Sequence, residues 1–548
     1  MLTAGLAFAQ PLKLSKDLVG KDLGARVDII VQFKRTPTEV HHQKVRSRGG
    51  QLKSELSIVK AGCYSLPAGA LESLAADSEV SYITPDRQVQ ASLDYAETTT
   101  NANIALQYGW DGTGIGIAVI DSGISSHPDL KDSSGKLRIV YHQDFVGGGT
   151  DDLYGHGQHV TGILAGNGAR SSGTGYTHTF RGIAPNARLV NLRVLDATGY
   201  GTDSAVIAGI QQAISLKTKF NIRVINLSLG RPVFESYTLD PLCQAVEAAW
   251  KAGVVVAVAA GNNGRDDSQG TNGYATINAP GNDPYVITVG AMKTMGTNSR
   301  GDDLVASYSS KGPTLMDHFV KPDIVAPGNR IISLLASKGS LDNTYPQNVI
   351  TLSYYKTGGS TSPSPDYFKL SGTSMATPMV SGAAALMLQK EPKLTPDQVK
   401  ARLMKTASKS FPPTSTATDP VTAAPYTSQY DIFTIGAGYL DAWAALNNTD
   451  LASGAALSPT ACYDSGSANV YLVTNTSAVW GNSAVWGNSA VWGNSVFLNG
   501  TSAVWGNSAV WGTSTTQAFS AVWGNSAVWG TSTNDSAESA SVTISGEN

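Results

Sequence analysis

Ser371-Gly372-Thr373-Ser374-Met375-Ala376-Thr377-Pro378 is the stretch that decides the fold, together with the run that follows it to Gln389. From Ser374 to Gln389 no residue is charged, and Met, Val, Ala and Leu occupy every side of a 3.6-residue period. This pattern predicts a helix that is buried on all sides, which requires a large domain around it. Because Pro378 has no backbone N–H, it is expected in a first turn, so the helix should begin close to Ser374.

Ser374 could serve either as a nucleophile or only as a helix cap. A serine at this position lies at the positive end of the helix dipole beside unpaired backbone N–H groups, where a developing oxyanion could be held. The alternative is a Ser/Thr N-cap on a core helix. The stretch alone leaves both interpretations open, so residues elsewhere in the chain have to decide between them.

The composition excludes several classes of protein. The 548 residues can form several domains, and a formal net charge of −3 gives no basic field for nucleic acid or an anionic membrane. No apolar run is long enough to span a membrane. Cys63, Cys243 and Cys462 are too few for a disulfide framework and are interpreted as incidental buried thiols. No Lys or Arg follows Lys409, so the C-terminal part is a separate, acidic region.

Residues 1–25 are interpreted as a signal remnant and a linker. Leu2 to Ala9 is mostly apolar and ends in Ala7-Phe8-Ala9, the small-x-small form of a signal-peptidase site. The apolar run is short and no basic residue precedes it, so we interpret it as a signal peptide truncated at a misplaced start. The alternative is a disordered end. The sequence therefore predicts a secreted, extracellular protein.

Residues 26–92 are predicted to form a first folded unit. Their pattern gives strands and helices in the order β-α-β-β-α-β of a ferredoxin-like plait. The polar stretch from Asp86 to Asn103 has little to pack, so residues 93–111 are predicted to be a linker that a protease can enter. The predicted strands of the plait are 26–33, 51–58, 63–66 and 80–83, and its predicted helices are 36–46 and 68–76.

Residues 112–446 show a different pattern, in which short apolar runs alternate with helices. The runs are rich in Val and Ile, which indicates a parallel sheet covered by helices on both faces. In such sheets functional groups gather at the carboxyl ends of the strands. The predicted strands are 114–120, 187–195, 223–229, 254–260 and 286–289, and the predicted helices are 203–219 and 241–252.

Three polar residues lie where such a domain would place its chemistry. Asp121 closes the first apolar run, and an acid directly after a buried strand is costly unless something pairs with it. Asn262 follows the run 254–260, and His156 lies between Gly155 and Gly157 at the start of a predicted helix. The alternatives are a turn cap for Asp121 and a satisfied or solvated ring for His156. For His127, His159 and His178 we keep that second interpretation.

Together these residues meet the needs of acyl transfer. That reaction needs a hydroxyl nucleophile, a neutral imidazole that takes its proton, and a carboxylate that fixes the imidazole tautomer and stabilises its cation. It also needs donors aimed at the tetrahedral oxyanion, and Asn262 could supply one. Ser374 does not lie in Gly-x-Ser-x-Gly, which counts against an α/β-hydrolase, whereas the order Asp, His, Ser matches the subtilisin arrangement.

Three motifs in this order resemble the signatures of the subtilases. They are Asp121-Ser122-Gly123, Gly155-His156-Gly157-Gln158-His159-Val160 and Gly372-Thr373-Ser374-Met375-Ala376-Thr377-Pro378. The resemblance covers about residues 112–446. Within the family, the chain resembles the AprX-type branch. It is strengthened by Ile225-Asn226-Leu227-Ser228-Leu229-Gly230, Ala259-Ala260-Gly261-Asn262 and Tyr308-Ser309-Ser310-Lys311-Gly312-Pro313.

The resemblance implies a subtilisin-like α/β fold and a role for each catalytic residue. Ser374 would be the nucleophile, His156 the general base and then the general acid, and Asp121 the orienting carboxylate. Asn262 and the backbone N–H of Ser374 would form the oxyanion hole. Gln158 stands where the family usually has Thr, beside the base rather than in the relay, so we expect it to have little effect.

The resemblance also implies a cleft for an extended peptide. Ser228, Leu229 and Gly230 would pair with the substrate backbone as an added strand, and this reads no particular side chain. Asn278 stands where many subtilisins keep Gly at the floor of the specificity pocket, so we expect a shorter pocket and reduced activity after large aromatic P1 residues. The residues that would line this pocket are Ala259, Ala260 and Gly261.

No cofactor is expected from the sequence. The strong calcium loop of the family is not recognisable, because Asn167 to Arg181 is rich in Gly and Ser and has no acidic residue. A structural calcium ion remains an alternative elsewhere, although the acidic residues that could bind it are interpreted as exposed turns. These residues are Asp151, Asp152, Asp266 and Asp267.

The N-terminal plait resembles the inhibitor-type propeptide of subtilases. A sheet packed on the enzyme can stabilise the folded protease, and its outgoing tail can lie through the cleft as the first substrate. We therefore expect the chain to cleave itself between Arg87 and Thr100. Its partners would be its own propeptide and protein or peptide substrates.

The C-terminal region consists of a linker, residues 447–470, and a low-complexity tail, residues 471–548. The tail repeats Ser-Ala-Val-Trp-Gly-Asn with a six-residue period. Such repeats could coil into a β-solenoid with a tryptophan ladder or form a flexible tail, and both interpretations stay open. Exposed tryptophans would favour surface attachment or self-association.

The sequence as a whole predicts a secreted, self-processing serine endopeptidase of broad specificity. The alternative is a non-catalytic surface or adhesion protein, in which the protease fold is a scaffold and the Trp repeats bind. The intact set of Asp121, His156, Ser374 and Asn262 argues against this alternative.

Overall fold

The computed structural model describes residues 13–15, 18, 22–86, 88–91, 99–268, 270–419, 424–464, 469–473 and 546–547. The proposed signal remnant at Leu2 to Ala9, residues 93–98 of the predicted processing linker and the Trp repeats lie outside the described residues. The rest of the predicted linker is described and contains the helix α3 (Ala102–Gln107). Within the described part of the chain, no helix is both long enough and apolar enough to cross a membrane.

An eight-stranded sheet forms the centre of the structure. Its order is β14-β13-β12-β10-β6-β8-β7, with β15 paired to β13. All neighbouring strands run parallel except β13 and β14. All five predicted strands are present, and three more join them. The strands are β6 (Gly116–Asp121), β7 (Ile139–Asp144), β8 (Arg188–Arg193), β10 (Ile222–Leu227), β12 (Val255–Ala259), β13 (Ile287–Lys293), β14 (Leu304–Val305) and β15 (Ile324–Pro327).

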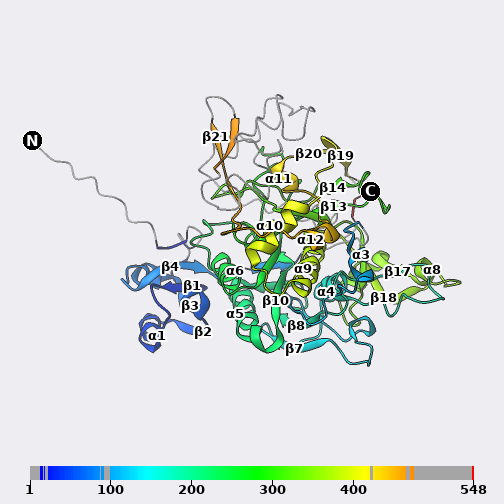
Figure 1. The fold of residues 1–548 in the computed structure, drawn as a ribbon. Helices are drawn as coiled ribbons and strands as arrows, with labels where there is room; N and C mark the ends of the chain where they lie inside the picture. The colour runs from blue at the N-terminus through cyan, green and yellow to red at the C-terminus, as the bar shows by residue number, and fades with distance from the viewer. Residues whose placement is uncertain are drawn as a thin grey trace, which may run out of the picture.

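Helices cover the sheet on both faces, as the sequence predicts. Figure 1 shows α5 (Asp203–Phe220) and α6 (Pro241–Lys251) on one side of β10 and β8, with α4 (His156–Ala165) and α9 (Thr373–Lys390) on the other. α9 is the predicted central helix: its residues from Thr373 to Leu388 are all buried, and it packs on β10, β12, β13 and β15.

The expected place of Pro378 in the first turn of this helix is wrong, because α9 begins at Thr373 and Pro378 lies one turn further in. A proline there removes the helical hydrogen bond to the carbonyl four residues earlier, which belongs to Ser374. The Ser228 hydroxyl donates to that carbonyl at 2.7 Å instead. A neighbouring strand end thus satisfies the acceptor that the helix loses.

Smaller elements surround the central sheet. β5 (Gln88–Ala91), β9 (Tyr200–Thr202) and β11 (Leu229–Gly230) form a three-stranded sheet in the order β11-β5-β9. A second one has the order β16-β18-β17. The remaining strands are β16 (Ile331–Leu334), β17 (Val349–Thr351), β18 (Pro363–Leu370), β19 (Thr414–Thr418), β20 (Pro425–Gln429), β21 (Thr460–Asp464) and β22 (Asn469–Val473). The remaining helices of this part are α3 (Ala102–Gln107), α7 (Leu341–Thr344), α8 (Leu352–Tyr355), α10 (Pro396–Thr406), α11 (Ile432–Ile435) and α12 (Ala442–Asn447).

The N-terminal unit is a four-stranded antiparallel sheet with two helices, in the β-α-β-β-α-β order of a plait. The strand order is β2-β3-β1-β4, and the unit has its own apolar cluster, which includes Ile29, Val31 and Leu66. Its elements are β1 (Arg26–Phe33), α1 (Glu39–Arg46), β2 (Gln51–Leu56), β3 (Ala61–Pro67), α2 (Leu71–Ala75) and β4 (Val80–Pro85).

The plait packs on α5 and α6 through apolar residues such as Leu56 and Val59, which belong to the core cluster of the larger domain, and two carboxylates add polar contacts. β2 contacts α5. Asp86 accepts a hydrogen bond at 2.6 Å from the backbone N–H of Ser204 in the first turn of α5, where the helix dipole favours a negative charge. Glu235 accepts from the hydroxyls of Ser15, at 3.0 Å, and Thr84, at 3.1 Å. Polar contacts therefore fix the orientation of the plait on the larger domain.

A buried arginine joins the N-termini of the two helices under the plait. Arg231 donates from Nε to Asp203, the first residue of α5, at 2.9 Å, and from Nη2 to Asp240, the N-cap of α6, at 2.8 Å. Arg231 is 2% exposed and both carboxylates are fully buried. Because Arg231 directly follows β11, its ion pairs with Asp203 and Asp240 also hold the end of that strand in position.

Replacing Arg231 should destabilise the protein strongly. Arg231→Met leaves two buried carboxylates without their cation, which costs about 3–5 kcal/mol of unfolding free energy. The matched control is Lys338→Met, because Lys338 pairs with Asp151 at the surface, with side chains 65% and 48% exposed. Denaturant unfolding of both variants tests this, and equal stabilities would contradict it.

Candidate active site

Asp121 and His156 are in direct contact. Asp121 is the last residue of β6 and His156 the first residue of α4, and their Oδ1 and Nδ1 atoms lie 2.6 Å apart. The backbone N–H of Ser122 donates to the same carboxylate oxygen at 2.7 Å. Asp121 is 1% exposed and His156 is fully buried. A carboxylate on Nδ1 fixes the tautomer that keeps Nε2 available as a base.

Ser374 lies in the first turn of α9, which packs against α4. Its hydroxyl donates to the backbone carbonyl of Ser228 at 3.1 Å. The preceding Gly372 has a φ of +145°, which favours glycine at this helix entry. The structure therefore places Ser374 and His156 at the N-terminal ends of two helices that touch each other.

Asn262 is tied to the residue just before Ser374. It follows β12, and its Oδ1 accepts from the backbone N–H of Thr373 at 2.9 Å and from the Thr373 hydroxyl at 3.1 Å. Thr373 also accepts from the N–H of Gly261 at 3.1 Å. With Oδ1 engaged in this way, the amide nitrogen is the end of the Asn262 side chain that can donate to a reacting group.

The expected substrate strand is paired within the chain itself. Leu229 and Gly230 of β11 lie opposite Ala91 and Gln90 of β5 in an antiparallel register. Ser228, the residue before β11, is the one that contacts Ser374. An extended segment of the same polypeptide thus lies along the edge that the sequence assigns to substrate.

Asn278 lies between the two glycines that would flank a specificity pocket. Its backbone N–H donates to the carbonyl of Ala260 at 2.9 Å, next to Ala259 at the end of β12. A Cβ atom on Gly261 would lie 2.8 Å from the Asn278 amide nitrogen, and one on Gly230 would lie 3.1 Å from the Asn278 Cβ. The side chain therefore fills space between β11 and the end of β12.

Asp152 is a structural residue that sequence reasoning missed, and its interpretation as an exposed turn is wrong. It is fully buried, and it accepts from the Ser122 hydroxyl at 2.9 Å and from the backbone N–H groups of Gly155 and Gln158, each at 2.7 Å. Burial raises the pKa of this carboxyl. Ser122 in turn accepts from the N–H of Gly157 at 2.8 Å, so Asp152 joins the Asp121 loop to the start of α4.

The remaining acidic candidates behave as surface turns. Asp151 is about half exposed and pairs with Lys338. Asp266 and Asp267 accept hydrogen bonds from the backbone N–H groups of residues two and five positions further along the chain, at 2.9 and 2.6 Å.

Gln158 is fully buried and accepts from the N–H of Ser125 at 2.8 Å, so it has a structural role beside His156.

The other histidines of interest have structural partners. His159 is fully buried between the carbonyls of Ile331 and Phe368, at 3.2 and 3.1 Å from Nε2, and burial lowers its pKa to about 3. His178 contacts the carbonyl of Tyr354 at 2.8 Å. His127 accepts from the N–H of Asp129 at 3.1 Å. Each ring therefore contacts a protein group through one nitrogen, whereas Nε2 of His127 and Nδ1 of His159 are buried without a hydrogen-bond partner among the described residues.

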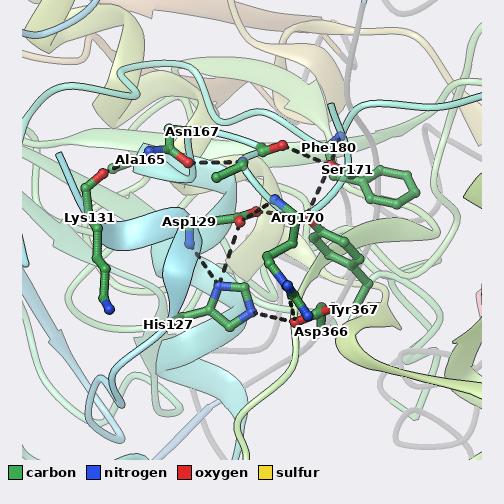
Figure 2. Close-up of polar contacts among 12 residues, drawn as sticks. His127, Asp129, Lys131, Ala165, Asn167, Arg170, Ser171, Phe180, Asp366 and Tyr367 are labelled. Atoms are coloured by element: carbon green, nitrogen blue, oxygen red, sulfur yellow. Dashed lines mark hydrogen bonds and ion pairs between the residues drawn. The ribbon is translucent and has the colours of Figure 1, made fainter. Parts of the chain in front are cut away.

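The Gly/Ser-rich segment Asn167 to Arg181 is held by protein donors. Figure 2 shows Asp129 beneath this segment, with Oδ1 accepting from the N–H of Arg170 at 2.8 Å and Oδ2 from the Tyr367 hydroxyl at 2.7 Å. Arg170 also pairs with Asp366 at 3.2 Å. Among the described residues, no group of three or more His, Cys, Asp or Glu is arranged to hold a metal ion. Both Asp129 oxygens accept from protein donors, and the segment Asn167 to Arg181 supplies no carboxylate of its own.

Metal removal should therefore leave residues 167–181 folded. Loss of the Tyr367 hydroxyl should destabilise them. We expect an excess of EDTA to leave the melting temperature unchanged. Tyr367→Phe removes a donor from a buried carboxyl and should cost about 1–3 kcal/mol of unfolding free energy. Differential scanning calorimetry with and without EDTA tests both statements, and a large fall in EDTA alone would contradict the first.

The part of the chain that holds these residues is similar to known proteins. The subtilase family profile matches residues 112–436. Serine protease AprX of Bacillus subtilis (strain 168) is 37% identical over 393 residues, which cover 69% of this chain and 82% of that protein. Subtilisin E of the same organism is 35% identical over 387 residues, which cover 69% of this chain and 84% of that protein.

A solved structure has the same fold. Fervidolysin from Fervidobacterium pennivorans, described as a keratinolytic enzyme related to subtilisin, matches with a TM-score of 0.56 and 22% sequence identity. The match covers 80% of this chain and 63% of that one. From the family profile, the identity to AprX and this fold, we conclude that the chain belongs to the subtilase family and is a serine protease of the subtilisin type.

Proposed function

We propose that this protease is an endopeptidase of broad specificity that uses Asp121, His156 and Ser374 as a catalytic triad and removes its own N-terminal plait. The observation that carries the proposal is the 2.6 Å contact between Asp121 and His156 at the start of a helix that packs on the helix of Ser374. The pairing of β5 with β11 supports the second half of the proposal.

The first half of the reaction forms an acyl-enzyme. The Ser374 hydroxyl turns from the Ser228 carbonyl to His156, which takes its proton as Oγ bonds to the substrate carbonyl carbon. The carbonyl electron pair moves to oxygen, and the Asn262 amide and the Ser374 backbone N–H donate to this oxyanion. Asp121 stabilises the imidazolium. The tetrahedral intermediate then collapses, and the C–N bond breaks as His156 gives its proton to the leaving amine.

The second half repeats these steps with water. His156 takes a proton from water as the oxygen attacks the ester carbonyl of the acyl-enzyme. The oxyanion forms between the same donors, the C–Oγ bond breaks, and Ser374 regains a proton from His156. The products are a carboxylic acid and an amine, and the enzyme returns to its starting state. No cofactor takes part in this scheme.

Substrates would bind by adding a strand to β11. The edge of Leu229 and Gly230 offers main-chain donors and acceptors, which any extended peptide can pair with, so the sequence requirement is low. β5 occupies this edge in the same chain, with Ala91 opposite Leu229. The segment from Ala259 to Gly261, together with Asn278, would then contact the P1 side chain.

The same register suggests where the chain cleaves itself. Gln90 and Ala91 lie opposite Gly230 and Leu229, so the register runs toward Ser228 as the chain reaches Ala91. The Ser374 hydroxyl lies 3.1 Å from the Ser228 carbonyl. We therefore propose cleavage after Ser92, within one residue, which narrows the expected window from Arg87 to Thr100. Ser374 is fully buried, so the uncleaved chain should be inactive on other substrates.

The location outside the cell and the binding role of the Trp repeats stay predictions. They rest on the resemblance to secreted subtilases and on the sequence of residues 471–548.

Replacing the nucleophile should stop both hydrolysis and processing. Ser374→Ala should lower kcat by roughly 10⁶-fold, the magnitude known from subtilisin, and should leave a full-length chain. Mass spectrometry should show that the wild type begins at Leu93, within one residue. An organophosphonate should label the processed wild type at Ser374 and leave the variant unlabelled.

Two outcomes would separate the parts of this proposal. A Ser374→Ala chain that is trimmed normally would mean that another protease makes the cut. A wild type that hydrolyses no peptide and takes no label would favour the non-catalytic binding protein instead.

Enlarging the proposed pocket should change the P1 preference. Asn278→Gly removes the side chain between Gly230 and Gly261, and we expect kcat/KM for Phe and Tyr at P1, relative to Ala, to rise roughly 10–100-fold. The control is Asn272→Gly, because Asn272 is exposed and has a φ of +53°, which glycine adopts readily. A P1 peptide library that ranks all three proteins alike would refute the role of Asn278.

A further inference from the structure

The C-terminal residues Gly546 and Glu547 lie in a buried pocket of the protease domain. Glu547 is 4% exposed. Its carboxylate contacts Arg265 Nη2 at 3.0 Å and Lys293 Nζ at 3.1 Å. It also accepts from the backbone N–H of Ser307, at 3.1 Å, and from the Ser307 hydroxyl. Figure 1 shows the C-terminus beside β13 and β14, which supply or adjoin these residues.

The pocket also recognises the main chain of this segment. The Asn329 side-chain amide donates to the carbonyl of Glu547 at 3.1 Å, and the Asn329 Oδ1 accepts from the N–H of Glu547 at 3.0 Å. A Cβ on Gly546 would lie 2.6 Å from the Ser371 hydroxyl oxygen and 2.7 Å from Arg330 Cγ, and the φ of Gly546 is +76°. The pocket therefore fits a Gly-Glu sequence, with an acid in the second position.

Charge explains why the occupant has to be an anion. Lys293 is 3% exposed, and the Arg265 side chain is 11% exposed. Asp419, which is 5% exposed, pairs with Arg265 at 2.7 Å and compensates one of these two cations. Glu547 adds a second buried carboxylate, and loss of its charge would remove the ion pairs with both Arg265 and Lys293, which is costly in a site shielded from water.

The pocket lies directly behind the catalytic residues. Arg265 follows Asn262 by three residues, and Ser371 precedes Ser374 by three. Gly328, next to Asn329, accepts from the N–H of Gly372 at 2.9 Å. A ligand in the pocket thus touches both segments that lead to the oxyanion donor and to the nucleophile.

We propose that this pocket is a binding site for the acidic C-terminus of the same chain, and that Gly546–Glu547 binds there to stabilise the segments behind Ser374 and Asn262. β22 ends at Val473, and 72 residues of the same polypeptide separate it from Gly546. The C-terminal segment of the same chain is present at the pocket at an effective concentration in the millimolar range. This concentration exceeds that of the C-terminal segment of a second copy at micromolar concentration. The inference is independent of the proposed catalytic mechanism.

The test uses full-length chains that also carry Ser374→Ala, so that the tail stays intact. Glu547→Gln removes the charge but keeps the shape of the side chain, and we expect the melting temperature to fall by roughly 2–6 °C. Glu538→Gln makes the same change of charge elsewhere in the tail and should leave the melting temperature unchanged. Equal melting temperatures for the two variants would overturn the proposal.

A peptide added in trans tests the binding site itself. Glu547→Lys brings a third cation to the pocket and should expel the C-terminus. A labelled peptide of residues 544–548, Ile-Ser-Gly-Glu-Asn, should then bind this variant and raise its melting temperature, while it binds the parent at least ten-fold more weakly. The same peptide with Gln in place of Glu should fail in both assays.

Two results would count against the proposal. If the peptide shows no saturable binding to the Glu547→Lys chain, the pocket is not a binding site for this sequence. If the parent forms dimers in light scattering that Glu547→Gln or the peptide dissociates, the occupant is the C-terminus of a second copy rather than of the same chain.

Discussion

The hydrogen bond between Asp121 and His156 is the interaction on which the site depends. It links the carboxyl end of a central strand to the N-terminus of α4 across a fully buried contact of 2.6 Å. A carboxylate at such a position is stable only with donors around it, and here the imidazole and the N–H of Ser122 provide them. Asp152 stabilises the same junction, because its carboxylate accepts hydrogen bonds from the Ser122 hydroxyl and from backbone N–H groups at the start of α4. The position of His156, the proposed base, therefore follows from how one loop supplies donors to two buried acids.

Much of the fold could be predicted because its central elements have strong local patterns. β6, β10 and β12 are continuous apolar runs, and α9 lacks charge over its whole buried length. The strands that were not predicted have weaker patterns. β7 carries polar residues at the sheet edge, and β14 and β15 have only two and four residues. The position of Pro378 was misjudged because its cost is compensated by Ser228, which lies far away in the sequence.

The same distinction applies to the candidate site: residues in short motifs could be predicted, whereas contacts between residues far apart in the sequence could not. Asp121, His156 and Ser374 lie in short motifs, and so they could be named from the sequence. The supporting contacts join residues that are far apart: Tyr367 and Asp129 are separated by 238 positions, and Glu547 and Ser307 by 240. No periodicity or spacing marks such pairs, because they arise only when distant segments pack together. Asp152 was missed because a buried acid and an exposed one look alike in a polar stretch.

The pairing of β5 with β11 has a consequence for the time at which the protein is made. A bare strand edge accepts the backbone of any extended polypeptide, including that of a sister molecule that has just left the ribosome. A cleft of the proposed kind, which pairs with main-chain atoms, would also accept unfinished copies of the same protein. Because a segment of the same chain covers this edge, each molecule can complete its fold before others of its kind compete for the cleft. Under the proposed function, covering this edge would protect newly made molecules against aggregation and self-digestion.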